Sequence, residues 1–263
     1  MKRLLFALLL VAPLSAPAQD AKKEIEKYQQ MLGEGSPAEL WELEGEALWK
    51  KPQGPKSVSF EKCDLGLGAG KVAGAYARLP RYFKDTDQVQ DLESRLLTCM
   101  TTQQGRSLKD ATARLFGNAD RPSEMEYLVA YVVGQSRGHK MAAPVSHPKE
   151  RASYELGRKI FFYRAGNWDF SCASCHGEQD KRIRMQDLPV LSEPAGAQKA
   201  YTTWPAYRVS NSQLKTMQWR INDCYRQMRF PEPDFASEAT IALTHYLAVT
   251  AKGAPYNGPG TKR

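Results

Sequence analysis

The sequence predicts a mainly α-helical protein that consists of two tandem copies of one domain. No stretch shows the sustained apolar–polar alternation of β-strands, and loops rich in Gly and Pro join apolar segments of helical length. An internal repeat divides the chain, because several residues recur 112 positions further along. The recurring pairs are Gly45 and Gly157, Gly54 and Gly166, Ser59 and Ser171, and Cys63 and Cys175. With 263 residues, 42% of them hydrophobic, the chain is long enough for two such domains.

Residues 1–18 have the composition of a secretory signal peptide. Lys2 and Arg3 supply positive charge, residues 4–12 are apolar, and residues 16–18 place alanines at the two positions that determine cleavage. We therefore expect cleavage before Gln19 and export of the mature chain into an oxidising compartment. No apolar run approaches the roughly 20 residues that span a bilayer, so we expect a protein that is not integral to the membrane.

Charge is distributed unevenly over the mature chain. Residues 19–150 carry 19 basic and 19 acidic residues, whereas residues 151–263 carry 16 basic and 10 acidic residues. The excess positive charge therefore lies in the second half. A nucleic-acid partner is not expected for an exported chain, and an anionic substrate or an acidic partner fits this charge better.

Each copy is expected to open and close with a helix. The apolar pair Leu48-Trp49 of the first opening helix recurs as Ile160-Phe161 in the second. Closing helices are predicted over residues 123–138 and 237–253, because both segments begin with Ser-Glu, an N-cap followed by an acidic residue, and both stop at glycine. Residues 139–149 have the composition of a linker. We therefore expect domains over residues 19–148 and 149–263.

The strongest chemical signal is the run Cys172-Ala173-Ser174-Cys175-His176. Cys-x-x-Cys-His is the spacing of c-type haem attachment, in which two thiols bond the haem vinyl groups and the histidine becomes the proximal iron ligand. A zinc site would need two more ligands at suitable spacing, and none is obvious. A structural disulfide would leave His176 without a role. We therefore predict one covalently bound haem c on Cys172, Cys175 and His176.

The first copy has lost this motif. Phe60 and Asp64 stand where the second copy has its first thiol and its proximal histidine. The first domain is therefore expected to be cytochrome-c-like but without haem. Its cysteines, Cys63 and Cys99, fall at the positions of haem attachment and distal ligation, which face each other across a haem pocket. We predict a disulfide between them, worth roughly 3–4 kcal/mol on the chain-entropy model.

Cys224 is the remaining cysteine and has no partner for a disulfide. It lies 48 residues after His176, a separation that suits the sixth iron ligand in a small cytochrome domain. Arg220 precedes it by four residues, so on a helix both side chains point the same way. Guanidinium groups lower the pKa of a neighbouring thiol and bind sulfur oxyanions through two hydrogen bonds. We predict that Cys224 ligates the iron and that Arg220 binds an anionic substrate.

Other assignments of these residues stay open. Met217 or Met228 could ligate the iron instead, which would give an ordinary electron-transfer cytochrome and leave Cys224 as an inert buried thiol. We expect a packing, surface or propionate-binding role for three further residues: Arg226, Arg229 and His245.

These features together resemble SoxA, the larger subunit of the SoxAX cytochrome of bacterial thiosulfate oxidation. The resemblance covers nearly the whole mature chain. It rests on the export signal, the two cytochrome-like halves, the CASCH motif and the stretch from Trp219 to Arg229. The CASCH motif is shared by c-type cytochromes in general, whereas the pattern Arg-x-x-x-Cys-Tyr-x-x-Met-Arg over residues 220–229 is much more specific.

The resemblance implies a reaction, partners and a compartment. A SoxA protein of the mono-haem type is a periplasmic subunit of L-cysteine S-thiosulfotransferase, which conjugates thiosulfate oxidatively to a cysteine of the SoxYZ carrier. It forms a heterodimer with SoxX, a small c-type cytochrome, and electrons leave through the haems. The family's haem-ligating cysteine, found as a persulfide, falls on Cys224, and its substrate-binding arginine falls on Arg220. The Cys63–Cys99 disulfide matches the one that replaces the first haem in mono-haem forms.

Other functions fit parts of the pattern. A plain electron-transfer cytochrome would make Cys224 dispensable. A thiosulfate dehydrogenase, which joins two thiosulfates into tetrathionate, also pairs a haem with a cysteine ligand, but it typically carries two haems in one chain. The degenerate first motif counts against it. A haem subunit that only docks a partner would leave Arg220 and Cys224 unexplained.

Overall fold

The computed structural model describes residues 36–117, 121–183 and 186–262, and the fold is mainly helical, as the sequence predicts. The predicted signal peptide at residues 1–18 lies outside the described residues. The α-helices are α2 (Ala38–Lys50), α3 (Leu92–Thr102), α4 (Leu108–Thr112), α5 (Glu124–Gly134), α6 (Pro148–Phe162), α7 (Cys172–His176), α8 (Pro194–Tyr201), α9 (Met217–Gln227) and α10 (Glu238–Thr250). The short strands are β1 (Arg81–Phe83), β2 (Gln88–Gln90), β3 (Arg182–Ile183), β4 (Gln186–Asp187), β5 (Ala206–Arg208), β6 (Gln213–Lys215) and β7 (Gly260–Lys262).

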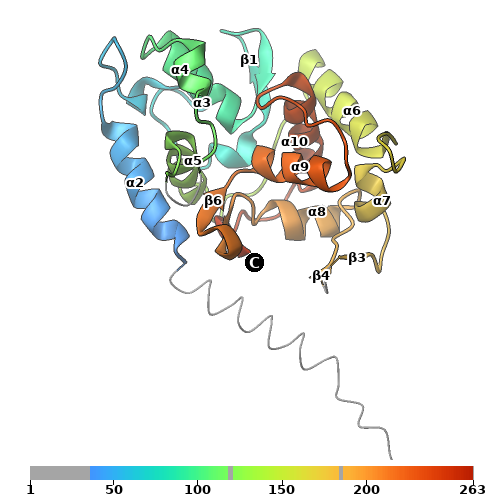
Figure 1. The fold of residues 1–263 in the computed structure, drawn as a ribbon. Helices are drawn as coiled ribbons and strands as arrows, with labels where there is room; N and C mark the ends of the chain where they lie inside the picture. Colours follow the sequence, from blue (N-terminus) through green and yellow to red (C-terminus); the bar gives the residue numbers. More distant parts are fainter. Residues whose placement is uncertain (1–35, 118–120, 184–185, 263) are drawn as a thin grey trace, which may run out of the picture.

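The two halves of the chain repeat one helix crossing. α2 packs against α5 in the first half, and α6 packs against α10 in the second, so that the halves lie side by side (Figure 1). A glycine lies at each crossing. A Cβ atom at Gly45 would collide with the backbone oxygen of Tyr127, and one at Gly157 would collide with that of Ala242. The recurrence of Gly45 as Gly157 is therefore a packing requirement, because these helix backbones approach too closely for any side chain.

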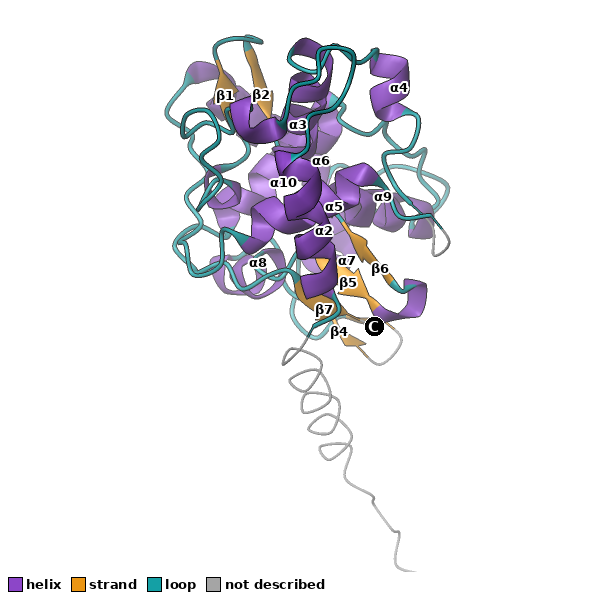
Figure 2. Ribbon diagram, turned by 90° about the vertical axis from the view of Figure 1, so that its left-hand side faces the viewer, coloured by secondary structure: helices purple, strands orange, loops and turns teal. Residues whose placement is uncertain are grey.

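A hairpin followed by a helix recurs at an offset of 125 residues. β1 and β2 form an antiparallel hairpin that leads into α3, and β5 and β6 form one that leads into α9. The registers match throughout, so that Phe83 paired with Gln88 corresponds to Arg208 paired with Gln213. In the second half, β7 adds to β5 in parallel and gives the sheet order β6-β5-β7 (Figure 2). The two cysteine-bearing helices therefore occupy the same place in each domain.

Capped helices begin where the sequence predicts. Ser123 caps α5 and Ser237 caps α10, each accepting a hydrogen bond from the backbone N–H three residues later. Both helices end a few residues earlier than predicted. Gly138 and Gly253, which were expected to mark their ends, instead adopt positive φ in the turns that follow.

The predicted disulfide between Cys63 and Cys99 is present in the first half. The two Cα atoms are 5.7 Å apart, and both cysteines are buried. Asp64, which stands at the position of the lost histidine, accepts hydrogen bonds from the backbone N–H groups of Gly66 and Gly68 at 2.7 and 2.8 Å. The positions that carry the haem motif in the second half thus hold a covalent crosslink and a loop anchor in the first.

The halves meet at the N-termini of α3 and α9. Asp91, the N-cap of α3, accepts a 2.6 Å hydrogen bond from Gln218 in the first turn of α9. Glu93, in the first turn of α3, lies beside Thr216, the N-cap of α9. The contact is reciprocal, because the cap of each helix meets the first turn of the other. All four residues are buried. Burial and the neighbouring Asp91 raise the pKa of Glu93 to about 8.

A buried ion pair also joins the halves. Lys215 Nζ in β6 lies 2.9 Å from Glu126 Oε1 in α5, and neither side chain exposes more than 2% of its surface. Lys215 also donates to the backbone oxygen of Gly117, and Glu126 accepts from the N–H groups of Gly117 and Ser123. Both charges are therefore hydrogen-bonded, which offsets the cost of removing them from water.

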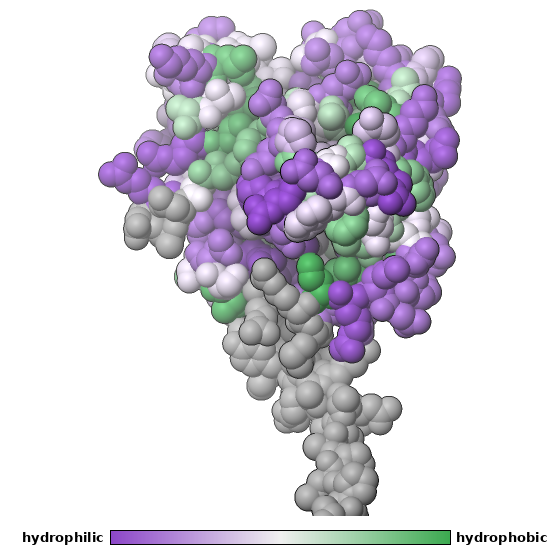
Figure 3. Space-filling view, turned by 45° about the vertical axis from the view of Figure 1, so that its right-hand side comes forward, coloured by the Kyte–Doolittle hydropathy of each residue, from purple (hydrophilic) through white to green (hydrophobic). Residues whose placement is uncertain are grey.

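The surface is mostly hydrophilic on the face shown in Figure 3, with smaller apolar areas between charged side chains. Within residues 36–117, 121–183 and 186–262, no helix combines the length and the apolar composition needed to cross a membrane.

Replacing Cys63 and Cys99 together by alanine should lower the free energy of unfolding by roughly 3–4 kcal/mol, because the disulfide restricts the unfolded chain. Denaturant titration followed by circular dichroism measures the loss. Reduction should destabilise the wild-type chain to a similar extent and leave the double variant unchanged. Equal stability of the oxidised wild type and the variant would contradict this prediction.

Replacing Glu93 by glutamine should make stability less sensitive to pH between about 4.5 and about 8. In the folded chain the pKa of Glu93 is about 8, against an ordinary 4.5, so the folded state keeps a proton that the unfolded state has lost. Stability therefore falls as the pH rises from about 4.5 to about 8. At about 1.4 kcal/mol per pKa unit, this contribution amounts to a few kcal/mol. Thermal unfolding across this pH range tests the prediction, and parallel Tm curves for both proteins would contradict it.

Candidate functional site

The haem motif forms its own short helix, α7. Ser171 caps it, since the Ser171 hydroxyl accepts from the N–H of Ser174 and the Ser174 hydroxyl accepts from the N–H of Ser171. A bridge between Ala165 and Phe170 closes the loop before this cap, and the first half has the same bridge between Gln53 and Val58. This loop therefore places Cys172 in the second half at the position that Phe60 occupies in the first half.

His176 is oriented by the segment that follows it. Its Nδ1 lies 2.9 Å from the backbone oxygen of Pro189, and its own backbone oxygen accepts from the N–H of Leu191 at 2.8 Å. A carbonyl oxygen only accepts, so Nδ1 carries the proton and the lone pair of Nε2 is left for a ligand. Burial lowers the pKa of His176, and the charge of Arg220 lowers it further, which keeps the ring neutral.

Three thiols lie close to His176. Cys172, Cys175 and Cys224 are half-buried and form no disulfide. Burial raises the pKa of Cys172 to about 12, with a further contribution from the neighbouring Cys224. Cys175 also raises the pKa of Cys224. Because these thiols affect one another's pKa, Cys172, Cys175 and Cys224 form one cluster.

Two opposing effects act on the pKa of the Cys224 thiol, and the sequence predicted one of them, the lowering by arginine. Burial is the largest effect and raises the pKa of its thiol, although Arg220 and Arg208 lower it. Arginine proximity alone therefore does not make this thiol acidic, since removal from water disfavours the thiolate more strongly.

Arg220 lies one helical turn before Cys224 on α9. Its Nη1 is 2.7 Å from Asp223 Oδ2, and its guanidinium lies 5.9 Å from the centre of the Trp204 ring. The side chain is 25% exposed, so an anion from solvent can reach it. Because Arg220 acts on both the Cys224 thiol and the His176 ring, these three side chains share one electrostatic environment.

The remaining candidates take structural positions. Met217 packs in the main hydrophobic core, and Met228 is buried at the end of α9. His245 is fully buried, with Nε2 2.8 Å from the backbone oxygen of Pro144, as expected of a packing residue. Arg226 and Arg229 are exposed, and Arg226 pairs with Glu232 and Asp223.

Sequence reasoning missed three residues of this site: Trp204, Arg208 and Asp223. One signal could have found the first two. The offset of 125 residues that relates Arg95 to Arg220 also relates the whole β1–β2 hairpin to β5–β6. The segment 204–208 therefore lies beside α9 as the segment 79–83 lies beside α3.

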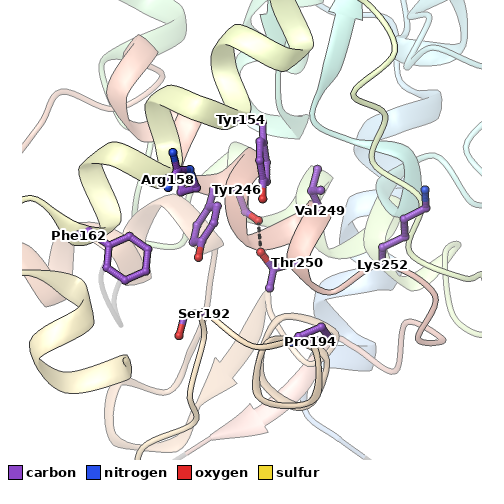
Figure 4. A pocket seen from close by; sticks show the side chains of 9 residues that line it. All are labelled: Tyr154, Arg158, Phe162, Ser192, Pro194, Tyr246, Val249, Thr250 and Lys252. Atoms are coloured by element: carbon purple, nitrogen blue, oxygen red, sulfur yellow. Dashed lines mark hydrogen bonds between the residues drawn. The ribbon is translucent and has the colours of Figure 1, made fainter. Parts of the chain in front are cut away.

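A separate groove lies between α6, α10 and residues 192–194, with a volume of about 570 Å³ (Figure 4). Tyr154 and Tyr246 face it from the two helices, and Arg158 and Lys252 add positive charge. None of the residues that line it belongs to the Cys224 cluster. In the segment that precedes the haem motif in the sequence, four aromatic side chains are exposed: Phe162, which also lines the groove, Tyr163, Trp168 and Phe170.

The residues present fit a c-type haem. Two unpaired thiols three positions apart can form thioethers, and the histidine beside them has its Nε2 free of the hydrogen bond that fixes the ring. Cys224 on α9 would be a further ligand to the haem iron, because it lies in the same cluster and forms no disulfide.

Comparison with known proteins agrees with these features. The family model for the SoxA/TsdA cytochrome c domain matches residues 44–141 and again residues 156–256. The "L-cysteine S-thiosulfotransferase subunit SoxA" of Hydrogenophilus thermoluteolus is 49% identical over 96% of this chain and 93% of its own length. A protein of the same name from Hydrogenobacter thermophilus is 37% identical over 98% of this chain and 93% of its own length.

A solved structure shows the same fold. The structure of SoxXA from P. pantotrophus superposes with a TM-score of 0.73 at 23% identity, covering 90% of this chain and 84% of the other. The two matched cytochrome c segments agree with the two halves built on the same helix crossing. The chain therefore belongs to the SoxA/TsdA family of cytochrome c proteins, and within it to SoxA.

Proposed function

We propose that this chain is the haem-bearing subunit of a periplasmic L-cysteine S-thiosulfotransferase, which joins thiosulfate oxidatively to a cysteine of a carrier protein of the SoxYZ type. The observation that carries the proposal is the convergence of Cys224, Arg220 and the haem motif in one cluster. The enzyme name of the SoxA relatives supports the same reaction.

One haem c per chain is part of the proposal. The sequence contains one Cys-x-x-Cys-His motif, and the equivalent positions of the first half hold a disulfide and a carboxylate hydrogen-bonded to backbone. Cys172 and Cys175 would attach the haem, and His176 and Cys224 would be its axial ligands. When bound, the haem accepts electrons one at a time and passes them to a partner cytochrome.

The chain's own residues account for substrate binding and bond formation. Arg220 binds the sulfonate oxygens of thiosulfate and leaves the terminal sulfur facing Cys224. The Cys224 thiolate and that sulfur form an S–S bond with the loss of two electrons. The carrier thiolate then attacks the sulfur that came from thiosulfate, the bond to Cys224 breaks, and Cys224 is released as a thiolate. The carrier leaves with an S-thiosulfonate group.

The proposed partner in the heterodimer is a small c-type cytochrome of the SoxX type. A two-electron oxidation needs a second one-electron acceptor beside the haem of this chain. Four aromatic side chains in the segment before the haem motif are exposed and would be available to a protein partner: Phe162, Tyr163, Trp168 and Phe170.

The mature protein purified from the periplasm should carry one covalent haem. Intact-mass spectrometry should give the mass of residues 19–263 plus a single haem, because only the second half has both thiols and the histidine. The same spectrum reports any additional sulfur on Cys224 and the two-hydrogen deficit of the disulfide. A mass with two haems would contradict the prediction.

Replacing Cys224 by methionine should keep a low-spin haem, raise its reduction potential and abolish thiosulfate conjugation. A neutral thioether stabilises ferric iron less than a thiolate does, and it cannot form the S–S bond. Optical redox titration and a conjugation assay with carrier protein measure the two effects. If the variant kept wild-type conjugation, a plain electron-transfer role would replace the proposed one.

A further inference from the structure

We propose that Trp204 is a positioning residue for Arg220: its ring holds the guanidinium in place and leaves the positive charge available to an anion. This role rests on the proposed function, in which Arg220 binds thiosulfate. Trp204 lies in the loop between α8 and β5 and acts through the arginine, not on the substrate.

Two groups hold the Arg220 guanidinium. Its central carbon lies 5.9 Å from the centre of the Trp204 ring, within the roughly 6 Å over which an aromatic face attracts a cation. Trp204 is only 8% exposed, so water weakens this attraction little. Arg220 Nη1 also donates to Asp223 Oδ2 at 2.7 Å. That carboxylate accepts from Gln227 at 2.9 Å and pairs with Arg226 at 3.5 Å as well, so Arg220 shares it with two other side chains.

Trp204 is itself fixed by buried contacts. The hydroxyl of Tyr76, a residue of the first half, donates to the backbone oxygen of Trp204 at 3.1 Å. The backbone N–H of Trp204 donates to the oxygen of Tyr201 at 3.1 Å. The two tyrosine rings stack with their centres 6.3 Å apart, and both are buried. The indole ring is therefore a rigid support for a side chain that packs on it.

The first half holds its corresponding arginine in a different way. Arg95, which lies 125 positions before Arg220, donates to both carboxylate oxygens of Asp85 at 2.8 and 3.0 Å and to the backbone oxygen of Asp64 at 2.7 Å. Its side chain is 4% exposed, against 25% for Arg220. The arginine of the first half is thus neutralised and buried, whereas that of the second half can be reached from solvent.

Two sequence differences between the halves agree with this contrast. At the same offset, Trp204 replaces Leu79, and Ser210 replaces Asp85. A ring attracts a guanidinium without cancelling its charge. It also covers a face of the planar group, so N–H donors at the edge remain for the oxygens of an anion. The second half therefore holds its arginine in a form that suits anion binding.

The test is calorimetric binding of thiosulfate to the oxidised holoprotein, together with KM and kcat for conjugation to carrier protein. Trp204→Leu introduces the residue that the first half has at Leu79, and Trp204→Phe keeps a smaller ring. Arg220→Ala and the double variant with Trp204→Leu complete a double-mutant cycle. Trp219→Leu is the matched control, because it removes from the same region a ring that lies 5.8 Å from a different arginine, Arg226.

We expect Trp204→Leu to weaken thiosulfate binding and raise KM about threefold to tenfold, with kcat nearly unchanged. Trp204→Phe should lose less, and Trp219→Leu should match the wild type. In the Arg220→Ala background, Trp204→Leu should cause no further loss, because the ring acts only through the arginine. Circular dichroism and the haem spectrum verify folding, and Trp204→Phe takes the place of Trp204→Leu in the cycle if the latter does not fold.

The outcomes separate this role from the proposed function. If Arg220→Ala weakens binding and the Trp204 variants do not, or if the two losses add in the double variant, the positioning role is wrong and the proposed function stands. If Arg220→Ala binds thiosulfate as tightly as the wild type, the substrate role of Arg220 is wrong and the positioning role fails with it.

Discussion

The position of the reactive helix depends on one buried contact between the halves. Gln218, in the first turn of α9, donates a 2.6 Å hydrogen bond to Asp91 and accepts one from the backbone N–H of Ala236 at 2.7 Å. Both side chains are almost fully buried, so leaving either without its partner would cost the desolvation of a polar group. Arg220 and Cys224 lie on the same helix, two and six residues further on. The first half thus helps to fix the helix that carries Arg220 and Cys224.

One scaffold supports two different interiors. The glycine at each helix crossing and the matching hairpins keep the backbone the same, while single side chains decide what fills the space between them. In the first half, Phe60 packs on Trp49 with ring centres 5.6 Å apart, and a disulfide joins Cys63 to Cys99. In the second half, the thiols at the corresponding positions remain unpaired. Where the second half carries its thiols, the first half is therefore held by an aromatic contact and a covalent crosslink.

Charge and burial act against each other at Cys224. Burial alone favours the neutral thiol, whereas the two arginines favour the thiolate and attract anions. The guanidinium groups beside this thiol remain charged at every physiological pH, so the positive charge of the site does not depend on pH. Asp223 restrains the Arg220 guanidinium by an ion pair within the same helix, at 2.7 Å.

Features that depend on covalent chemistry and on local residue pattern could be predicted from the sequence. These are the haem motif, the lost motif in the first copy, the serine caps of the closing helices and the pairing of Cys63 with Cys99. Each is read from residue type and spacing, since caps and thiol pairs act over short distances or follow from the repeat. The tertiary structure alone decided the contacts between segments far apart in the chain. It placed Trp204 beside Arg220 of α9, joined Gln218 to Asp91, and buried the Cys224 thiol so that burial outweighs the effect of the arginines on its pKa. The reason is physical: burial and long-range packing depend on which surfaces meet, and no local pattern in the sequence reports them.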